Sequence, residues 1–431
     1  MEQGHHTHHP TGARARQGRC RFHYRRGSIV STSSANTARP LSGVRVIDVS
    51  RVLAGPLCGQ MLADMGADVI KVEAPNGDEN RQWAPIAEDG ESCNFMSVNR
   101  GKRGITLNLK DPDGRQVLYA LLEQADVLLH SFLPSTAAAL GIEPQTLREQ
   151  YPRLVICGIS AFGAQGELAD RPGYDALLQA FSGIMSFTGE RNGGPVRSGV
   201  SFVDMTTGIL AYSGVLTALM GRAQTQQGTL VNASLLETAV FLLGYHGVGW
   251  LSTGALPRRE GSGLWHLVPY QVFACQDGEV LTGALNDATW RRLCRSVGRP
   301  DLENDPGLTT NAGRLARRDE VIDEFKRIFA NGTVAEWIER LEAGGVPIAP
   351  LHTIAQALTH PQSLANDMVV EVDSGNGAPL QLLGTGFKVG MGPHHSPRRP
   401  PRLGEHADEI LRDIAGLSAD RIQALRARGV V

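Results

Sequence analysis

The sequence predicts an α/β fold with two domains, a large one built on a mostly parallel sheet and a smaller α+β one. Three observations favour it. Short apolar strands alternate with amphipathic helices through the first half of the chain, which is typical of a sheet covered by helices on both faces. From about Trp265 the pattern changes to short strands with a turn at Asp277-Gly278. A length of 431 residues is also long for a single core.

The first folding signals follow Pro40 and predict a β-α-β unit. Residues 44–49 form a predicted buried strand, residues 51–67 a loop and helix, and residues 68–73 a second strand. The connecting loop lacks the G-x-G-x-x-G pattern, so a dinucleotide fingerprint is absent. A nucleotide is still expected at the carboxyl ends of the strands in such a Rossmann-like domain.

The alternation continues along the chain, with strands expected at 103–109, 126–132 and 153–163 and a helix at 113–125. The longest apolar patch, residues 235–251, is interrupted by two polar residues and predicts a buried helix. No run of about 18 apolar residues occurs, so no membrane span is expected.

Composition describes an ordinary globular protein, with 42% hydrophobic and 20% charged residues. A net charge of −2 predicts no general attraction to nucleic acid or to anionic membranes. The six cysteines are scattered and form no C-x-x-C pair, so we expect reduced thiols in a cytoplasmic compartment and no metal site.

Residues 1–39 predict a disordered tail. The clustered histidines His5, His6, His8 and His9 have no other ligands nearby and favour a solvated segment over a metal site. Six arginines between positions 14 and 26 meet a single acid, Glu2, and a Ser/Thr-rich piece follows. This composition resembles a transit peptide, which would place the protein in the mitochondrial matrix, and it equally fits an overlong start.

Two carboxylates, Asp175 and Asp204, each stand directly before a helix-like apolar run. A glycine-rich connection containing Gly193, Gly194 and Gly199 separates them. An aspartate in this position is usually a helix cap, because its side chain accepts from the first free N–H groups. Chemistry at these two residues is the competing interpretation.

Several motifs decide between these interpretations, because the chain resembles the class III CoA-transferase family from about Pro40 to Val431. This family contains formyl-CoA transferase, carnitine-type CoA-transferases and α-methylacyl-CoA racemases. The motifs that carry the resemblance are GADVIKVE at Gly66–Glu73, VNRGKR at Val98–Arg103, SFLPS at Ser131–Ser135, GVPIAP at Gly345–Pro350 and LGEHADEIL at Leu403–Leu411. The resemblance implies a large domain at 40–245, a small domain with linkers at 246–365, and a C-terminal segment at 366–431 that returns to the large domain.

The resemblance also implies roles for individual residues. Asp204 matches the nucleophile of the transferases, and Asp175 lies beside it. Tyr174 stands where the racemase branch has a histidine base, which favours transfer because a phenol that titrates near 10 is a poor base. Contacts with CoA are implied for Leu53, Ala54, Ala74, Leu107, Lys110, Ser131, Phe132 and Tyr174. Where family members differ, Arg81, Lys102 or Arg103 are alternative contacts for the adenine and phosphates.

Gly261 and Gly263 occupy the position of the family's mobile glycine loop, whose N–H groups are expected to stabilise oxyanions. The stretches Asn192–Val200 and Val268–Phe273 resemble the dicarboxylate branch, such as succinyl-CoA:glutarate or hydroxymethylglutarate CoA-transferases. A dicarboxylate has a distal charge that needs a cation, and Arg197 is the candidate.

The function implied is CoA transfer from a dicarboxylyl-CoA, such as succinyl-CoA, to a free carboxylic acid through an aspartyl-CoA thioester on Asp204. CoA is then a substrate, no cofactor is bound permanently, and the family predicts an interlocked homodimer. Two alternatives stay open at this point: a 2-methylacyl-CoA racemase, and a non-catalytic acyl-CoA-binding protein in which Asp204 only caps its helix. The sequence does not decide the pair of acids.

Overall fold

The computed structural model describes residues 39–375, 377–390 and 394–431. The predicted tail and its possible targeting role fall on residues that lie, except for Arg39, outside this part of the chain.

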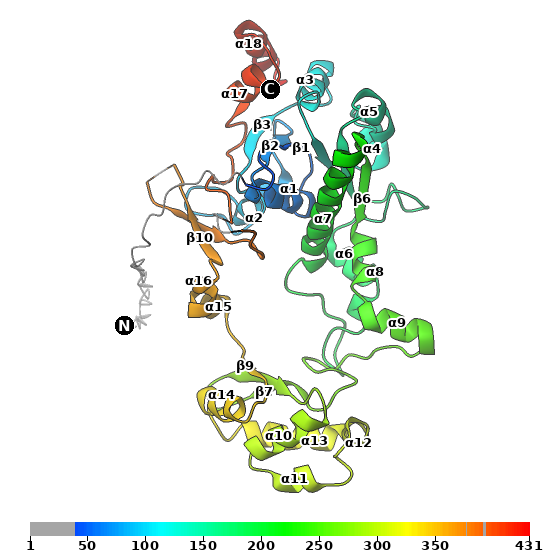
Figure 1. The fold of residues 1–431 in the computed structure, drawn as a ribbon, viewed down its shortest axis with the longest axis vertical. Helices are drawn as coiled ribbons and strands as arrows, with labels where there is room; N and C mark the ends of the chain where they lie inside the picture. Colours follow the sequence, from blue (N-terminus) through cyan, green and yellow to red (C-terminus); the bar gives the residue numbers. More distant parts are fainter. Residues whose placement is uncertain (1–38, 376, 391–393) are drawn as a thin grey trace, which may run out of the picture. The chain divides into compact units, whose positions relative to one another are not determined.

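A six-stranded parallel sheet confirms the α/β fold class (Figure 1). Its strand order is β3-β2-β1-β4-β5-β6, and every neighbouring pair is parallel. The strands are β1 (Arg45–Asp48), β2 (Asp68–Glu73), β3 (Arg103–Thr106), β4 (Val127–His130), β5 (Val155–Ser160) and β6 (Leu230–Ser234). All six carboxyl ends therefore meet at one edge of the sheet, where the polar residues of a site can gather.

Alternate residues of these strands enter two different hydrophobic cores. Val46, Val127 and Leu129 face the core beneath α1 (Ala54–Asp64) and α7 (Phe202–Thr225). Ile47 and Leu128 face the opposite core. That second core is closed by α3 (Pro112–Leu122), α4 (Pro134–Ala139), α5 (Pro144–Gln150), α17 (Ala407–Asp413) and α18 (Ala419–Ala427). Burial on both faces explains why the strands are almost continuously apolar.

A separate core is built from residues 268–346. It packs around the antiparallel sheet of β7 (Tyr270–Ala274), β8 (Glu279–Gly283) and β9 (Ile348–Pro350). Its helices are α10 (Asp287–Ser296), α11 (Pro300–Asn304), α12 (Asn311–Ala316), α13 (Arg318–Phe329) and α14 (Val334–Ala343). The strands and helices expected after Trp265 are thus present, while the proposed domain limits stay a prediction.

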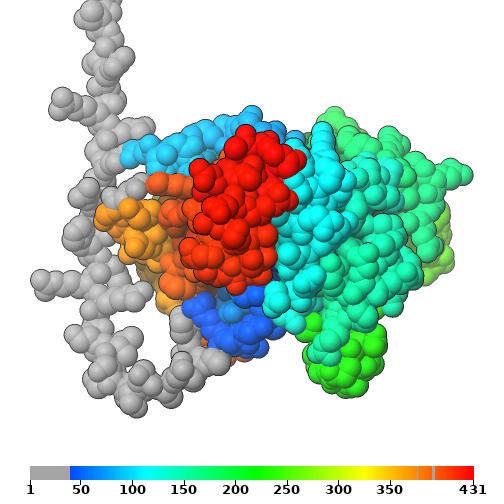
Figure 2. Space-filling model, turned by 90° about the horizontal axis from the view of Figure 1, so that it is seen from above, coloured from blue at the N-terminus to red at the C-terminus, as the bar shows by residue number. Residues whose placement is uncertain are grey.

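The C-terminal segment lies against β3 and α3. Figure 2 shows this segment, in red, beside the residues around 100–122, in cyan. The N–H of Asn108 donates to the carbonyl of Val430 at 2.8 Å, and Arg421 pairs with Asp113 at 2.6 Å. Helices α15 (Ile354–Thr359) and α16 (Pro361–Ala365) precede this segment, which begins with the hairpin of β10 (Val369–Val372) and β11 (Leu380–Leu383).

The prediction of one buried helix over residues 235–251 is wrong. The stretch forms α8 (Leu235–Phe241) and α9 (Gly244–Thr253), and α9 has no buried residue. Gly244 has a φ of +50°, a conformation that favours glycine and separates the two helices. An apolar run does not reveal whether this chain or another molecule covers it. The prediction that this chain buries residues 235–251 therefore failed for α9.

Helix α7 is, among the described helices, the one long and apolar enough to cross a membrane by length and composition alone. Its buried side chains, which include Val203, Ala211 and Val215, pack in the core shared with α1 and the sheet. A central helix of a folded core meets the same criteria, so length and composition alone do not identify α7 as a membrane span.

Candidate active site

The strand order reverses between β1 and β4, which creates a crevice at their carboxyl ends. The loop after β1 and the loop after β4 meet there, because the N–H of Arg51 donates to Oγ of Ser131 at 2.9 Å. Leu53 and Ala54 begin α1 on one side of this contact, and Phe132 lies on the other with the Arg51 guanidinium 5.6 Å from its ring centroid. The structure therefore brings these four predicted CoA contacts together.

Val52, in the loop after β1, adopts a φ of +68°, which is unfavourable for a β-branched residue. Two buried side chains hold this backbone. The Val52 N–H donates to the carboxylate of Asp78, with a shortest distance of 3.2 Å, and its carbonyl accepts from Nδ2 of Asn80 at 2.7 Å. Strained backbone of this kind persists where the surroundings enforce it, and it is concentrated at functional sites.

Buried charges support the same loop from below. Lys71 Nζ donates to Asp78 at 3.0 Å and to the carbonyl of Ser50 at 2.5 Å. Asp48 pairs with Lys102 at 2.8 Å, and all four of these ionisable groups are buried. Because a buried charge is tolerated only with a partner, the network fixes the path of residues 48–52.

Asp204 is the third residue of α7 and lies one turn before Gly208 on the same face of the helix. Gly208 packs so closely on the start of α1 that an added Cβ would lie 2.6 Å from the carbonyl oxygen of Ala54. The beginning of α7 is therefore pressed against the beginning of α1. This contact puts Asp204 at the edge of the sheet where the crevice opens.

Asp175 begins α6 (Asp175–Phe181), as the sequence predicts, but its carboxylate caps a different helix. Oδ2 accepts from the N–H groups of Val203 at 2.8 Å and Asp204 at 3.1 Å. Oδ1 accepts from Nε2 of Gln179 at 2.5 Å, and Gln179 also accepts from the N–H of Ser198 at 2.9 Å. The buried Asp175 thus fixes the start of α7 and the approach to it.

The Asp204 carboxylate makes no hydrogen bond or ion pair with any residue that the structure describes. Asp175 already takes the N–H groups that a capping aspartate would use, so the interpretation of Asp204 as a cap of its own helix is wrong. Burial, with a contribution from the charge of Asp175, raises the pKa of Asp204 to about 7.

Three of the four remaining predicted CoA contacts follow β2 and β3. Ala74 and Lys110 are exposed, whereas the side chain of Leu107 is buried in the core and its N–H donates to the carbonyl of Glu73. Only the backbone of Leu107 therefore remains for the predicted contact.

The alternative basic contacts are largely committed elsewhere. Lys102 is fully buried against Asp48, which corrects the suggestion that it meets a phosphate. Arg103 begins β3, at the opposite edge of the sheet from the crevice, and pairs with Asp68 at 2.7 Å. Arg81 pairs with Glu73 at 2.8 Å.

The predicted glycine loop and its neighbours form a second group of residues. The N–H of Gly261 donates to the carbonyl of Gly189, and that of Gly263 to the carbonyl of Glu260, both at 2.9 Å. These two donors are therefore occupied in this arrangement. Tyr174 is exposed and precedes α6, and Arg197 is exposed with its guanidinium on the carbonyl of Ser198 at 2.8 Å.

Sequence reasoning missed the residues that hold the loop after β1, namely Asp48, Lys71, Asp78 and Asn80. One signal was available. Lys71 lies within an apolar strand that the sequence predicts to be buried, and a buried lysine needs a carboxylate partner. Nothing in the local sequence identified Asp78 as that partner.

An open parallel sheet with a crevice at its switch point is typical of α/β proteins that bind nucleotide-bearing ligands, and a carboxylate without a capping role lies at this edge. The chain belongs to CoA-transferase family III, whose family model matches residues 41–407, and it is a CoA-transferase.

Named relatives cover nearly the whole chain. An acyl-CoA transferase from Fusarium pseudograminearum is 37% identical over 95% of this chain and 92% of its own length. The human succinyl-CoA:glutarate CoA-transferase is 33% identical over 93% of this chain and 91% of its own length. The crystal structure of a CAIB/BAIF family protein from Brucella suis matches with a TM-score of 0.79 and 32% identity, over 88% of this chain and all of that one.

Proposed function

We propose that this CoA-transferase moves CoA from succinyl-CoA or another dicarboxylyl-CoA to a free carboxylic acid, with Asp204 as the nucleophile. An Asp204 oxygen attacks the thioester carbonyl carbon and expels CoA thiolate, which leaves a mixed anhydride. The thiolate attacks the Asp204 carbonyl carbon, releasing the donor acid as a carboxylate and forming the aspartyl-CoA thioester. The acceptor carboxylate then attacks this thioester and expels thiolate, which attacks the acceptor's carbonyl carbon and frees Asp204.

The observation that carries the proposal is the unbonded carboxylate of Asp204 at the crevice. A nucleophilic carboxylate needs its lone pairs free and its water removed, because hydration slows the attack and water destroys the anhydride. Asp175 supports this state by capping α7 in place of Asp204. Binding of CoA along Leu53, Ala54, Ser131 and Phe132 would bring the thioester to this edge.

The relatives favour dicarboxylic acids as substrates. Besides the human protein, relatives of 33–35% identity carry the names succinate–glutarate CoA-transferase in Agrobacterium fabrum, acetyl-CoA:oxalate CoA-transferase in Acetobacter aceti and succinyl-CoA:mesaconate CoA-transferase in Haloarcula marismortui. We infer a dicarboxylate as donor, acceptor or both, with succinyl-CoA and glutarate as the first pair to assay.

The decisive experiment incubates the purified chain with succinyl-CoA alone and measures intact mass. A covalent CoA adduct that hydroxylamine removes, and that is absent in Asp204→Asn, is the expected result. Exchange of the α-proton of a 2-methylacyl-CoA for deuterium, without an adduct, would instead establish the racemase. Binding of acyl-CoA with neither outcome would leave a non-catalytic binding protein.

A homodimer is also part of the proposal. Three successive helices expose large apolar side chains: Met220 on α7, Phe241 at the end of α8, and Tyr245, Val248, Trp250 and Leu251 on α9. Apolar surface of this extent is usually covered by a partner, and we propose a second copy of the chain, as the family resemblance implies. We also propose, from the sequence, a location in the cytoplasm or in the mitochondrial matrix.

A further inference from the structure

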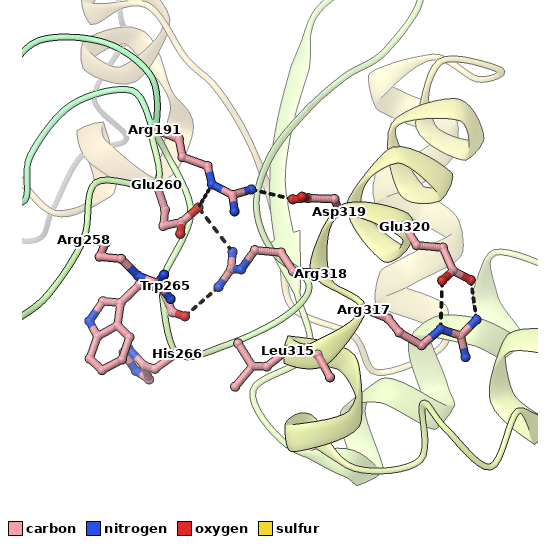
Figure 3. A pocket seen from close by; sticks show the side chains of 11 residues that line it. Arg191, Arg258, Glu260, Trp265, His266, Leu315, Arg317, Arg318, Asp319 and Glu320 are labelled. Carbon is pink, nitrogen blue, oxygen red and sulfur yellow. Dashed lines mark hydrogen bonds and ion pairs between the residues drawn. The ribbon is translucent and has the colours of Figure 1, made fainter. Parts of the chain in front are cut away.

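A cavity of about 630 Å³ lies where three segments far apart in sequence meet (Figure 3). They are the turn that contains Arg191, the linker 258–266, and the junction of α12 and α13. Its size falls within the range of small-molecule sites, roughly 300–1,000 Å³. Neither Asp204 nor Asp175 lines it, so it is distinct from the crevice that contains the two aspartates.

Two guanidinium groups, those of Arg191 and Arg318, face one buried carboxylate in this cavity, and Arg258 lines the cavity as well. The side chain of Glu260 is 7% exposed, and its Oε2 lies 3.8 Å from Nε of Arg191 and 3.7 Å from Nη1 of Arg318. Both distances exceed the 2.7–2.9 Å or so of a charge-assisted hydrogen bond. Glu260 therefore offsets part of the positive charge without occupying the donors of either arginine.

The other contacts hold the arginines in place. Nη2 of Arg318 donates to the carbonyls of Leu264 and Trp265, both at 2.7 Å, and Arg191 pairs with Asp319 on its other side (Figure 3). Arg258 makes no hydrogen bond or ion pair with the residues of the described ranges. Burial lowers the pKa of Arg318, and the charges of Arg191 and Arg258 lower it further, against the opposing effect of Glu260. The cavity thus retains uncompensated positive charge.

Aromatic rings supply an apolar wall beside these charges. The rings of Trp265 and His266 pack edge to face with centroids 5.4 Å apart. Nδ1 of His266 is buried and has no hydrogen-bond partner within the part of the chain that the structure describes. Guanidinium groups next to an apolar wall suit a small anion with a hydrocarbon body, rather than a bare inorganic ion.

We propose that this cavity binds the free dicarboxylic acid, with Arg258 and Arg318 each holding a carboxylate and Trp265 packed on the methylene chain. The planar fork of the Arg258 guanidinium matches a carboxylate with two parallel hydrogen bonds. Arg318 would donate from Nη1 alone, because its Nη2 is already bonded to two carbonyls. The inference rests on the proposed transfer of CoA to a dicarboxylic acid. Glu260 directly precedes Gly261, so an acid bound here lies next to the glycine loop, whose N–H groups are expected to stabilise oxyanions.

Binding is measured first, on the full chain, by calorimetry with glutarate and with pentanoate, which has the same length but one carboxylate. Glutarate is expected to bind at least tenfold more tightly than pentanoate. Arg258→Met is expected to weaken glutarate about tenfold, the usual effect of losing a charged hydrogen bond, and to leave pentanoate within twofold. Arg327→Met is the matched control, because Arg327 is a 70% exposed arginine of α13 that pairs with Glu324 away from the cavity.

Steady-state kinetics give the second readout. Arg258→Met is expected to raise KM for glutarate about tenfold while KM for succinyl-CoA and kcat at saturating glutarate stay within twofold. Quenching of tryptophan fluorescence by glutarate is expected in the wild-type chain and absent in Trp265→Phe, which assigns the signal to the cavity.

Unchanged glutarate affinity in Arg258→Met would overturn the inference, and so would a loss found in Arg197→Met instead. Displacement of glutarate by 3′-phosphoadenosine bound to the same arginines would also overturn it, since the cavity would then hold the coenzyme's phosphate. If glutarate binds as expected but the chain transfers no CoA, the proposed function is wrong while the dicarboxylate site stands.

Discussion

At the scale of single residues, Asp175 and Asp204 differ in their hydrogen bonds. One carboxylate could not both cap α7 and stay free of hydrogen bonds. Asp175 accepts the N–H groups at the start of α7, and Asp204 is left without a hydrogen bond from any described residue. A carboxylate bound to N–H groups is stabilised as an anion and becomes a weaker nucleophile. In the proposed mechanism, this division of roles would keep the Asp204 carboxylate reactive while α7 remains capped.

The raised pKa of Asp204 predicts how formation of the adduct depends on pH. Only the ionised carboxylate attacks, so the rate of adduct formation should rise between pH 6 and 8 around an apparent pKa of about 7. Asp175→Asn removes a like charge, so it should shift this profile to lower pH. Single-turnover rates measured by rapid quench across this range check both statements, and a flat profile in the wild-type chain would contradict them.

The same pKa predicts that Asp204 destabilises the fold at neutral and alkaline pH. Its pKa is higher folded than unfolded, so the folded chain binds more protons and stability falls as pH rises from about 4 to 7. Asp204→Asn should therefore stabilise the chain at pH 8 by about 2–4 kcal/mol and change little near pH 4. Urea unfolding at both pH values tests this, with the exposed Asp323→Asn as a control that should change little at either pH.

At the scale of elements, the contact between α1 and α7 depends on Gly208. A methyl group there would meet the carbonyl oxygen of Ala54 at 2.6 Å and Cβ of Leu57 at 3.1 Å, and a backbone oxygen in a helix has little room to move. The same helix contains Gly221, whose added Cβ would meet no atom within 4 Å. The two glycines form a matched pair on one helix.

Gly208→Ala should lower stability by about 1–3 kcal/mol and reduce transfer activity, because α7 must move away from α1 and take Asp204 with it. Gly221→Ala should be neutral or stabilising by up to about 1 kcal/mol, since alanine is the better helix former. Chemical unfolding and turnover assays on both variants give the comparison. Equal effects of the two substitutions would show that the contact is not tight.

The loop after β1 provides a second prediction at this scale. Asn80→Ala removes the hydrogen bond to the carbonyl of Val52, so the strained loop should relax and CoA should bind about tenfold more weakly. Val52→Gly should keep its affinity within a few-fold, because glycine adopts a positive φ without strain. Calorimetry with CoA distinguishes the two variants. Unchanged CoA affinity in Asn80→Ala would show that the conformation of this loop does not affect coenzyme binding.

At the scale of the whole molecule, the apolar side chains on α7, α8 and α9 predict a homodimer. Phe241 and Leu251 are 71% and 76% exposed, so replacing both with Asp should cost little stability in an isolated chain. In a dimer the two charges would be buried, so the double variant should elute as a monomer by light scattering while the wild-type chain has twice the mass. A wild-type chain of monomer mass would contradict the assembly.

The sequence by itself determined the alternation of strands and helices, the start of α6 and the family motifs, and it placed the start of α7 a few residues late, since α7 begins at Phe202. These features repeat over a few residues, and local periodicity and turn chemistry report them directly. The boundaries were less accurate at 103–109, where β3 ends at Thr106. The exposure of α9 was missed because hydropathy alone does not reveal what covers an apolar surface.

Only the tertiary structure decided which groups meet. It placed the Asp175 carboxylate on the start of α7, paired Lys71 with Asp78, and gathered Arg191, Arg258 and Arg318 around one cavity. It also raised the pKa of Asp204, since burial and a neighbouring charge are properties of surroundings contributed by several segments. The physical reason is that hydrogen bonds, ion pairs and desolvation act through space between residues far apart in the chain, where no local pattern records them.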